Sequence, residues 1–566
     1  MILEPRPVPV EAAQGLEQAG LHPVLARVFA ARGVRSPESI GHSLEGLLPP
    51  DSLRNIDQAS ELLQRAIAEG QTLCIVGDYD CDGATATALA VRGLRALGAR
   101  VDYLVPNRLV HGYGLSAPLV ALALQHPRLG RPDLLITVDN GIASHEGIAA
   151  AHQAGMKVVV TDHHLPGEHL PSAAAIVNPN QPGCPFPSKH LAGVGVMFYV
   201  LAALRARLRQ AAPDGPAARL NLSRLLDLVA LGSVADVVKL DENNRRLVAA
   251  GLRTLRSGQG CEGIRAIFTA AGKDWRAAQS TDLGFVVGPR VNAAGRLADI
   301  TLGISALLSE DPDEAAGIAT QLDAINRERR TIEATMREQA IASLDAIPPG
   351  RYSVSVHHPD WHEGVVGLIA GRLKTLYARP AFAFATAAAD PKMARGSGRS
   401  IAGLHLRDLL DLMTRRAPGL IDRFGGHAMA AGLSLPVANV EPFGRLLETV
   451  IAEHADPALF APSLATDGEL DPALVDLPLV GQMDAQVWGQ GFPPPIFQHE
   501  FQVIRQRIVG ENHLKLDLAS GRRRYEAIAF GRTEPFPNRA LLAWRPQVNE
   551  FRGLRSVQLV IEGCEG

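Results

Sequence analysis

The stretch Thr72–Gly83, TLCIVGDYDCDG, decides the fold of the first half of the chain, because an apolar run ends there in a cluster of acidic residues. The apolar part, Thr72–Gly77, has the length and composition of a buried strand. Ala84–Leu97 has helical spacing and stops at Gly98, and Val101–Val105 is a second apolar run. The sequence therefore predicts a strand, a helix and a further strand here.

The same alternation continues after this unit. Asp133–Val138 (DLLITV) and Met156–Thr161 (MKVVVT) are two more short apolar runs, and a stretch with helical spacing lies between them. Short apolar strands that alternate with helices form a parallel sheet covered by helices on both faces. We therefore expect an α/β domain with a parallel sheet, at residues 50–310.

Three of these strands end in acidic residues or histidines. In open parallel sheets the carboxyl ends of the strands meet at one edge, where ligands bind. Each cluster alone also fits a solvated turn, since Asp and Gly favour turns, but three clusters at one edge favour a binding site. The clusters are Asp78-Tyr79-Asp80-Cys81-Asp82-Gly83, Asp139-Asn140-Gly141 and Asp162-His163-His164.

Carboxylates crowded at that edge would repel one another unless cations bound there. Neighbouring carboxylates raise each other's pKa, and divalent cations remove this penalty. Carboxylates with imidazole and without thiolates suit Mn²⁺, with Mg²⁺ as the alternative. Two such ions about 3.5–4 Å apart serve in-line displacement at phosphorus. A further candidate is Asp236, the one acid in the apolar stretch Leu231–Leu240, which we expect to be buried and paired.

The composition argues against several other classes of protein. The 566 residues include five cysteines and no CxxC pair, so neither a disulfide framework nor a thiolate zinc site is expected. No GxxxxGK[ST] motif is present, and Gly193-Val194-Gly195 lacks the preceding strand and the third glycine of a dinucleotide fingerprint. The N-terminus has no signal segment, and the longest apolar run, 193–204, is too short for a bilayer. We expect a cytoplasmic protein without a membrane partner.

A long helix is predicted between two halves of the chain. Asp311-Pro312 is a capping residue followed by proline at the first helical position, and helical spacing continues up to Pro348-Pro349. The alternative is two helices with a break. The whole prediction is an N-terminal helical segment (1–49), the α/β domain (50–310), the connecting helix (311–349), a second α/β domain (350–458) and a C-terminal β-barrel (459–566).

The C-terminal region carries the basic residues. The chain has a net charge of −3, yet residues 501–566 hold eleven Lys or Arg against seven Asp or Glu. Strand-like runs separated by Gly and Arg clusters suggest a small barrel. A positive groove with exposed aromatic rings would hold a single strand of nucleic acid, although each aromatic residue could equally belong to the core of the barrel. The residues concerned are Arg505, Arg507, Lys515, Arg522, Arg523, Arg524 and Arg532, with Phe501, Tyr525, Phe530, Trp544 and Phe551.

These motifs resemble those of a known family. GDYDCDG (77–83), TVDNG (137–141), TDHH (161–164) and LGSVADVV (231–238) resemble the four motifs of the DHH phosphoesterase superfamily. HGYGLS (111–116), GPRVNAAGRL (288–297), WHEGVVGLIAGRL (361–373), GSGRSIAGLHLRDLL (396–410) and RFGGHAMAAGL (423–433) are similar to its RecJ branch of single-strand-specific DNA exonucleases. GQGFPPPIF (489–497) and GENHLKL (510–516) resemble the OB-fold of that branch. The second α/β domain is then a DHH-associated domain.

The resemblance implies roles for individual residues. Asp139 would bridge two ions, and Asp78 would support the site or join the first ion. His164 would face the scissile phosphate as transition-state stabiliser or acid. The implied metal ligands are Asp80, Asp82, Asp139, His163 and Asp236. Amide and arginine clusters grip phosphates; the implied substrate-binding residues are Tyr113, Arg290, Asn292, Arg296, Ser397, Arg399, Gly425, Gly426 and His427.

The implied activity is a metal-dependent 5′-to-3′ exonuclease on single-stranded DNA that releases 5′-mononucleotides in DNA repair and recombination. The implied partner is a single strand with a 5′ end, and a helicase and a single-strand-binding protein are candidate protein partners. One alternative is a phosphodiesterase of the same superfamily for small molecules, which would not need the barrel. Another is a scaffold without activity, which could lose the metal motifs.

Overall fold

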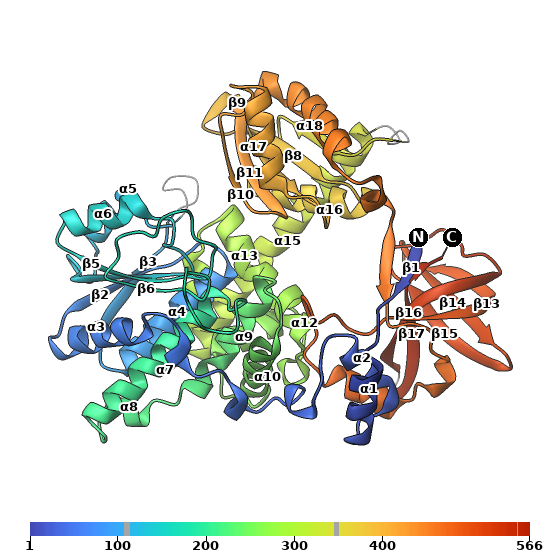
Figure 1. Ribbon diagram of the computed structural model, residues 1–566, viewed down its shortest axis with the longest axis horizontal. Coiled ribbons are helices and arrows are strands. Elements are labelled where there is room, and N and C mark those ends of the chain that lie inside the picture. Colours follow the sequence, from blue (N-terminus) through green and yellow to red (C-terminus); the bar gives the residue numbers. More distant parts are fainter. Residues whose placement is uncertain (107–113, 345–349, 552, 566) are drawn as a thin grey trace.

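The protein, described here by a computed structural model, is defined at residues 1–106, 114–344, 350–551 and 553–565. Figure 1 shows an α/β domain, a second α/β domain above it, and a β-barrel on the other side. Within the defined ranges, no helix combines the length and the apolar character that a bilayer crossing needs. The predicted fold class is confirmed: a parallel-sheet domain, a second α/β domain and a closed barrel.

The first domain contains a parallel sheet in the order β3-β2-β4-β5-β6. Its strands are β2 (Thr72–Val76), β3 (Arg100–Leu104), β4 (Leu134–Val138), β5 (Lys157–Thr161) and β6 (Ala175–Val177). The first four are the predicted strands. The sequence missed β6 because its three residues are too few to give a period.

Helices cover both faces of this sheet, as predicted. Alternate residues of β2 face opposite sides: Leu73 and Ile75 belong to one core cluster, and Cys74 and Val76 to another. The first cluster is closed by α3 (Ile56–Ala68), α4 (Cys81–Ala96) and α7 (Gly193–Ala211), and the second by α5 (Ala117–Ala123) and α6 (His145–Gln153).

A helical layer follows, and one long helix leaves it. The layer contains α9 (Leu226–Ala235), α10 (Glu242–Arg256), α11 (Glu262–Ala270), α13 (Gly288–Leu297) and α14 (Thr301–Leu308), and the long helix is α15 (Pro312–Ser343). Asp311 caps α15 as predicted, and the 32 residues form one helix without a break.

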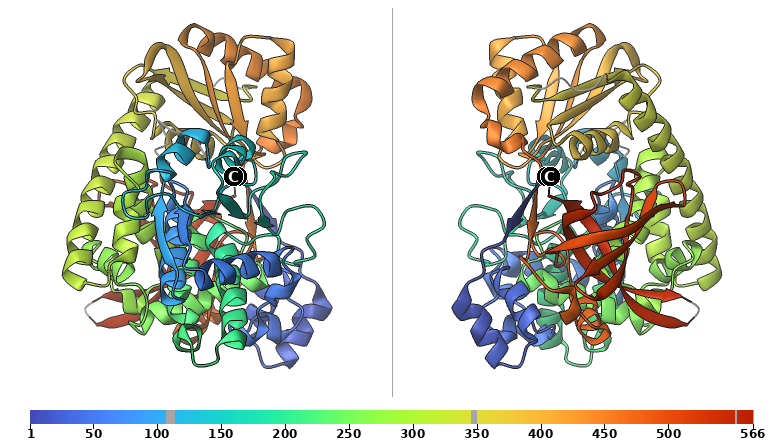
Figure 2. Two further views of the ribbon diagram at one scale, coloured as in Figure 1. Left: turned by 90° about the vertical axis from the view of Figure 1, so that its left-hand side faces the viewer. Right: turned by 90° about the vertical axis from the view of Figure 1, so that its right-hand side faces the viewer.

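The far end of α15 packs into the second domain, where Met336 and Ala340 join a core with Trp361. Figure 2 shows this yellow-green helix along one side of the molecule. The tail of the predicted connecting segment, 345–349, lies outside the described residues.

The second domain has a mixed sheet in the order β10-β11-β9-β8-β7. Its strands are β7 (Val354–His358), β8 (Ala381–Ala387), β9 (Asp390–Arg399), β10 (Arg423–Gly426) and β11 (Ala430–Pro436). Only β7 and β8 pair in parallel. Three helices pack on the sheet: α16 (Val366–Tyr377), α17 (Leu406–Arg416) and α18 (Val440–His454).

The C-terminal barrel closes in the order β13-β14-β15-β17-β16. Its strands are β13 (Phe497–Val509), β14 (His513–Ser520), β15 (Arg523–Ala529), β16 (Arg539–Phe551) and β17 (Leu554–Cys564). The sequence did not indicate β16, because Pro546 interrupts its pattern and proline is unusual inside a sheet.

The aromatic residues of the barrel divide between core and surface. Phe501 and Trp544 are fully buried, so the groove prediction is wrong for these two and the core alternative holds. Tyr525 is half-buried, and Phe530 is 53% exposed.

The N-terminal segment docks onto the C-terminal region. Its helices α1 (Val10–Gln18) and α2 (Pro23–Ala30) agree with the helical prediction, but β1 (Ile2–Pro5) pairs in parallel with β12 (Ser463–Thr466). Beyond α2, Arg32 forms a buried ion pair with Asp467 at 2.6 Å. Sequence patterns alone did not indicate this contact, because its two partners lie at opposite ends of the chain.

Candidate active site

The three predicted clusters meet at the carboxyl edge of the parallel sheet. His163, after β5, lies at the centre: its Nε2 is 3.1 Å from Asp139 Oδ1, 3.5 Å from Asp236 Oδ2 and 3.9 Å from Asp82 Oδ2. Asp236 follows the last residue of α9, so a helix outside the sheet completes the cluster. Its side chain is 27% exposed, which makes it less buried than the sequence predicted.

Helix N-termini hold two of the acids. Asp80 is the N-cap of α4 and accepts a hydrogen bond from the amide of Gly83. Asp82 is 1% exposed and accepts from the amides of Gly193 (2.6 Å) and Val194 (3.0 Å), at the start of α7. A helix N-terminus stabilises negative charge, so both carboxylates are oriented before any ligand binds.

The glycine-rich start of α7 therefore has a function that the sequence did not reveal. It is not a dinucleotide motif; its backbone amides bind the carboxylate of Asp82. A Cβ on Gly193 would lie 2.5 Å from Cβ of Asp139, so only glycine lets α7 approach the acids. Gly232 of α9 is constrained in the same way, because its Cβ would lie 2.7 Å from Asp82 Oδ1.

Asp139 occupies a strained backbone position. Its φ is 62°, in the left-handed region that residues other than glycine rarely adopt. The next residue, Asn140, is fully buried and donates to the carbonyl oxygens of Val76 (3.0 Å) and Val138 (2.9 Å), which ties the loop to β2 and β4. Strain of this kind persists where the surrounding structure holds a functional group in place.

Burial and mutual repulsion raise the pKa values of the acids. Burial, followed by repulsion from neighbouring carboxylates, raises the pKa values of Asp78, Asp139 and Asp236 well above their ordinary value. The same two causes raise the pKa of Asp82 to about 7. Such a cluster is costly unless cations offset the charge.

The residues present fit divalent cations. Among the described residues, three groups of three side chains each have their ligand atoms within 4.8 Å of one another, and Asp139 and His163 each belong to two of these groups. The groups are Asp78, Asp80 and Asp139; Asp82, His163 and Asp236; and Asp139, His163 and His164. The predicted metal ligands are thus distributed over these groups, and Asp139 is shared by two of them.

His163 has the protonation state that a ligand needs. Burial, followed by the charge of His164, lowers its pKa to about 4, so the imidazole is neutral at physiological pH. Its Nε2 is buried and makes no hydrogen bond to any atom of the described residues. A buried ring nitrogen surrounded by carboxylates is suited to a metal ion.

His164 differs from its neighbour. Its Nδ1 lies 2.7 Å from Asp162 Oδ1. Burial alone would lower the pKa of His164, but the hydrogen bond and charge of Asp162, with the charges of Asp236 and Asp78, raise it to about 9. His164 is therefore a protonated group at the edge of an acidic cluster; cations that neutralise the nearby acids will reduce this shift.

Asp162 is a positioning residue that the sequence prediction left out. It is 1% exposed and also accepts from the amide of Ile142 at 2.9 Å. Two asparagines, Asn178 and Asn180, donate to the carbonyl oxygens of His164 and His163 at 2.9 and 2.6 Å. In the sequence, the position of Asp162 directly before the two histidines was the feature that could have indicated this role.

The second domain presents its glycine loop to this site. The ring of His427, in the turn between β10 and β11, stacks at 6.4 Å from the ring of His164. Gly425 is exposed, and Gly426 has φ 143° with a Cβ that would lie 2.4 Å from the carbonyl oxygen of Ala430. Glycine is required there, and the turn brings the second domain to the metal cluster.

Two more predicted substrate-binding residues lie on β9, which neighbours β11. Arg399 donates to Ser397 Oγ at 2.9 Å, and both side chains are half-buried. They approach Gly367 of α16, whose Cβ would lie 3.1 Å from each. The pair therefore lies where β9 meets the start of α16.

The motif at 288–297, which contains three of the predicted substrate-binding residues, forms helix α13, and its residues have structural partners. Arg290 is buried and donates to Asp323 Oδ1 (2.8 Å) and to the carbonyl oxygen of Val286, so it joins α13 to α15. Asn292 Oδ1 accepts a hydrogen bond from the amide of Cys81 at 2.8 Å, and this bond holds the segment Asp80–Asp82 (the DxD loop) in place.

Of the remaining predicted residues, Arg296 is half-buried and lies 3.4 Å from the carbonyl oxygen of Gly364, in the second domain. The structure thus places it where the two α/β domains meet. Tyr113 lies outside the described residues.

Comparisons with known proteins agree with this architecture. Three family models match the chain: the DHH family N-terminal domain at residues 72–233, the DHHA1 domain at 350–453 and the RecJ OB domain at 466–563. The chain is 47% identical over 557 residues to the single-stranded-DNA-specific exonuclease RecJ of Dickeya dadantii, covering 95% of each chain. All of it aligns with the crystal structure of RecJ from Thermus thermophilus in complex with Mn²⁺, with a TM-score of 0.83, 28% identity and 79% of that chain covered. RecJ from the same organism in complex with Mg²⁺ aligns over all of this chain and 78% of that one, with a TM-score of 0.77 and 27% identity.

Proposed function

The chain belongs to the RecJ family of single-stranded-DNA-specific exonucleases, and we propose that it hydrolyses single-stranded DNA from the 5′ end and releases nucleoside 5′-monophosphates. Mn²⁺ is the cofactor, with Mg²⁺ as the alternative. The observation that carries this proposal is the position of Asp139 and His163, each shared between adjacent groups of possible metal ligands. DNA repair and recombination are the processes that require such an activity.

Each part of the site has a distinct task. Asp80, Asp82, Asp139, His163 and Asp236 would hold two cations, and Asp78 would complete the group around Asp80. Bound there, the cations would supply an activated water and stabilise the charge that develops on the phosphate. The chain itself provides the geometry, since the amides of α7 and the strained loop at Asp139 fix the carboxylates in advance.

His164 would act on the scissile phosphate. Its Nδ1 is held by Asp162, so its Nε2 can carry a proton toward a phosphate oxygen. The charge of a protonated imidazole stabilises the additional negative charge of the transition state. The ring of His427 lies 6.4 Å from that of His164, so the second domain would be able to contact the same phosphate.

The second domain would grip the nucleotides near the 5′ end. Gly425 and Gly426 at the end of β10, with Ser397, Arg399 and Arg296, would offer donors of the kind that bind phosphates. Arg290 and Asn292 would contribute by holding α13 and the DxD loop in place, and Tyr113 stays a predicted contact.

The barrel favours a polynucleotide over a small molecule. A dinucleotide or pyrophosphate needs only the two α/β domains, whereas the barrel adds a basic surface suited to a longer strand. A helicase that separates strands and a single-strand-binding protein that covers them are the partners that would supply such a substrate.

The test is a side-by-side digestion with Mn²⁺. Labelled single strands, blunt duplexes, duplexes with 5′ or 3′ overhangs, a dinucleotide and pyrophosphate are offered to the same protein. We expect loss of the single strand from its 5′ end, mononucleotide products and arrest at blunt duplex. Equal digestion of both overhangs and the blunt duplex would refute the proposed polarity and strand choice.

A further inference from the structure

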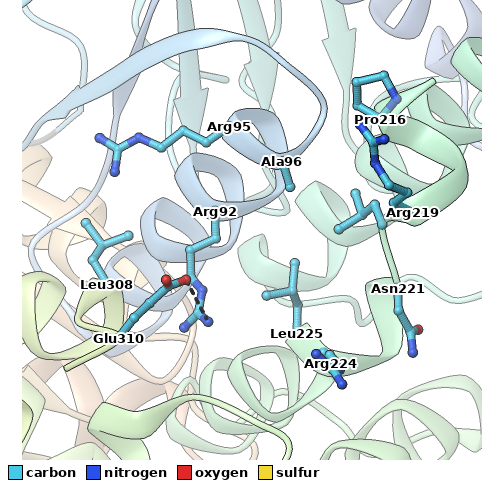
Figure 3. Close-up of a pocket in the computed structure, with 11 residues that line it drawn as sticks. Arg92, Arg95, Ala96, Pro216, Arg219, Asn221, Arg224, Leu225, Leu308 and Glu310 are labelled. Atoms are coloured by element: carbon cyan, nitrogen blue, oxygen red, sulfur yellow. Dashed lines mark ion pairs between the residues drawn. The ribbon is translucent and has the colours of Figure 1, made fainter. Parts of the chain in front are cut away.

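An arginine-lined cavity lies in the first domain, away from the metal site. Its volume is about 960 Å³, and it is formed by the C-terminal part of α4, the 216–225 segment and the end of α14. Arg92, Arg95, Arg219 and Arg224 line it, and Leu225 and Leu308 supply apolar surface (Figure 3).

Two of the four arginines that line this cavity have an acidic partner within the described ranges, and two do not. Arg92 lies 3.9 Å from Glu310, whose side chain is 85% exposed, and Arg95 lies 3.6 Å from Asp102. Neither Arg219 nor Arg224 has a carboxylate within 4.0 Å among the residues that the structure describes. Both are exposed, and in Figure 3 they lie across the opening from Glu310. Although the whole chain has a net charge of −3, four arginine side chains therefore lie together at this cavity.

The cavity is separate from the catalytic machinery. Helix α4 begins at the metal-binding edge, and Arg95 lies 14 residues after Cys81, which is about 21 Å along the helix. The cavity is thus near the opposite edge of the sheet. In Figure 1 the adjoining helix α8 (Pro216–Arg219) lies at the far end of the first domain from the barrel, and the second domain is above. A strand held between the metal site and the barrel would not pass this cavity.

The lining selects between possible anions. Nucleic acid backbones bind along extended basic stripes, and phosphate makes no use of an apolar floor. A cavity of this size accepts a whole chain segment. Glu310 already demonstrates how a carboxylate meets Arg92, and Leu225 with Leu308 could cover an apolar side chain.

We propose that this arginine-lined cavity is a docking site for an acidic segment of a partner protein, with its carboxylates on Arg219 and Arg224 and an apolar side chain against the two leucines. Docking there would bring a partner to the enzyme without obstructing the metal site. The proposal goes beyond the nuclease function and does not depend on it.

The experiment measures binding of a fluorescein-labelled Asp-Asp-Asp-Leu-Leu peptide to the full chain by anisotropy. In the double variant Arg219→Ala/Arg224→Ala we expect binding to weaken at least about tenfold, since two charge-assisted hydrogen bonds can no longer form. The matched control is Arg65→Ala/Arg415→Ala, which removes the same charge from exposed helix surfaces, where each arginine is paired with an acid one turn away. Control binding should equal that of the unmodified protein.

Two further arms identify the ligand class. Replacing the peptide's leucines by serines should weaken binding, and replacing its aspartates by serines should abolish it. A labelled oligothymidine should bind the double variant and the unmodified protein equally, and single-strand hydrolysis should be unchanged. Equal peptide binding by the double variant would overturn the proposal, and so would a selective loss of oligothymidine binding, which would make the cavity a nucleic acid site.

Discussion

The edge of the parallel sheet and the C-terminal barrel both carried clear expectations, but the structure brings the predicted side chains together only at the sheet edge. At the sheet edge, the predicted metal ligands are distributed over three overlapping groups of the described residues, and Asp139 and His163 each belong to two of them. In the barrel, two of the aromatics expected to be available for stacking, Phe501 and Trp544, are core residues. The two regions use residues whose burial has opposite energetic consequences.

Burying a charge is unfavourable unless a ligand or partner compensates it, so several acids in buried positions already indicate a bound cation. Burying an aromatic ring is favourable in itself and needs no ligand. Acidic motifs such as Asp78–Asp82 are therefore specific evidence for function. Aromatics between strands become specific only when the structure leaves them exposed, as it does Phe530.

The largest effect should come from Asp139. Asp139→Asn preserves the shape of the side chain but removes the charge shared by two groups of ligands. We expect nuclease activity with Mn²⁺ to fall by roughly a thousandfold, since about 4 kcal/mol of transition-state stabilisation depends on the cations. Chelation of the metal should have the same effect on the unmodified protein, measured as release of mononucleotides. Near-normal activity in a folded variant would refute the two-cation site.

The same variant should be more stable without metal. The pKa of Asp139 is raised in the folded state, so its ionisation opposes folding at every pH above its ordinary pKa, and the penalty grows until the pH passes the raised value. At acidic pH the group is protonated in both states and has no effect. In chelator, the melting temperature of Asp139→Asn should exceed that of the unmodified protein, by a margin that grows as the pH rises. A margin that shrank with rising pH would show that the carboxylate is favourable even without cations.

A smaller loss is expected at Asp162, which contacts His164 rather than a predicted cation site. Asp162→Asn keeps an oxygen for the amide of Ile142 but removes the charge that raises the pKa of His164. We expect a roughly 10–100-fold loss of activity, typical of partners that orient functional groups. The alkaline limb of the pH–rate profile should move to lower pH, because His164 would lose its proton earlier. A profile that kept its position would leave Asp162 a purely structural residue.

How far the sequence predicted the fold depended on how local the signal was. The strands β2 to β5 and the cap of α15 are encoded in short stretches, and each was correct. The β1–β12 pairing joins opposite ends of the chain and left no local pattern. Arg290 shows the limit for the site: an arginine looks the same in sequence whether it faces a phosphate or, as here, a buried aspartate.

A more modest effect is expected at the contact between the two α/β domains. His427→Ala removes the ring that stacks on His164, and with it the donor that we propose for binding the substrate phosphate. We expect about a tenfold rise in KM with a smaller change in kcat, since one hydrogen bond to a charged group contributes about 1.5 kcal/mol. His454→Ala, on α18 of the same domain, is the control. A change confined to kcat would mean that His427 acts in the chemical step instead of in binding.

The smallest effect should come from the barrel, where the exposed arginines offer a test of DNA binding that the buried aromatics do not. Arg522, Arg523 and Arg524 are exposed in the turn before β15 and on its first residues. Changing all three to alanine should weaken binding of a long single strand and flatten its salt dependence. The slope of log K against log salt should fall by about 0.7 for each phosphate that the barrel no longer neutralises. Hydrolysis of a very short oligonucleotide should stay near normal, because it does not reach the barrel.

The matched control for this variant is Arg539→Ala/Arg545→Ala. These arginines are already paired with Glu500 and Glu562, so their removal should leave the salt slope unchanged. If the triple variant also keeps its slope, the exposed arginines form a solvated turn that does not bind DNA. The barrel would then have a structural role, like its buried aromatic residues. If only the triple variant has a flatter slope, the exposed arginines of the barrel bind the strand. Their position would then be explained by a ligand rather than by folding, as is the position of the buried acids at the sheet edge.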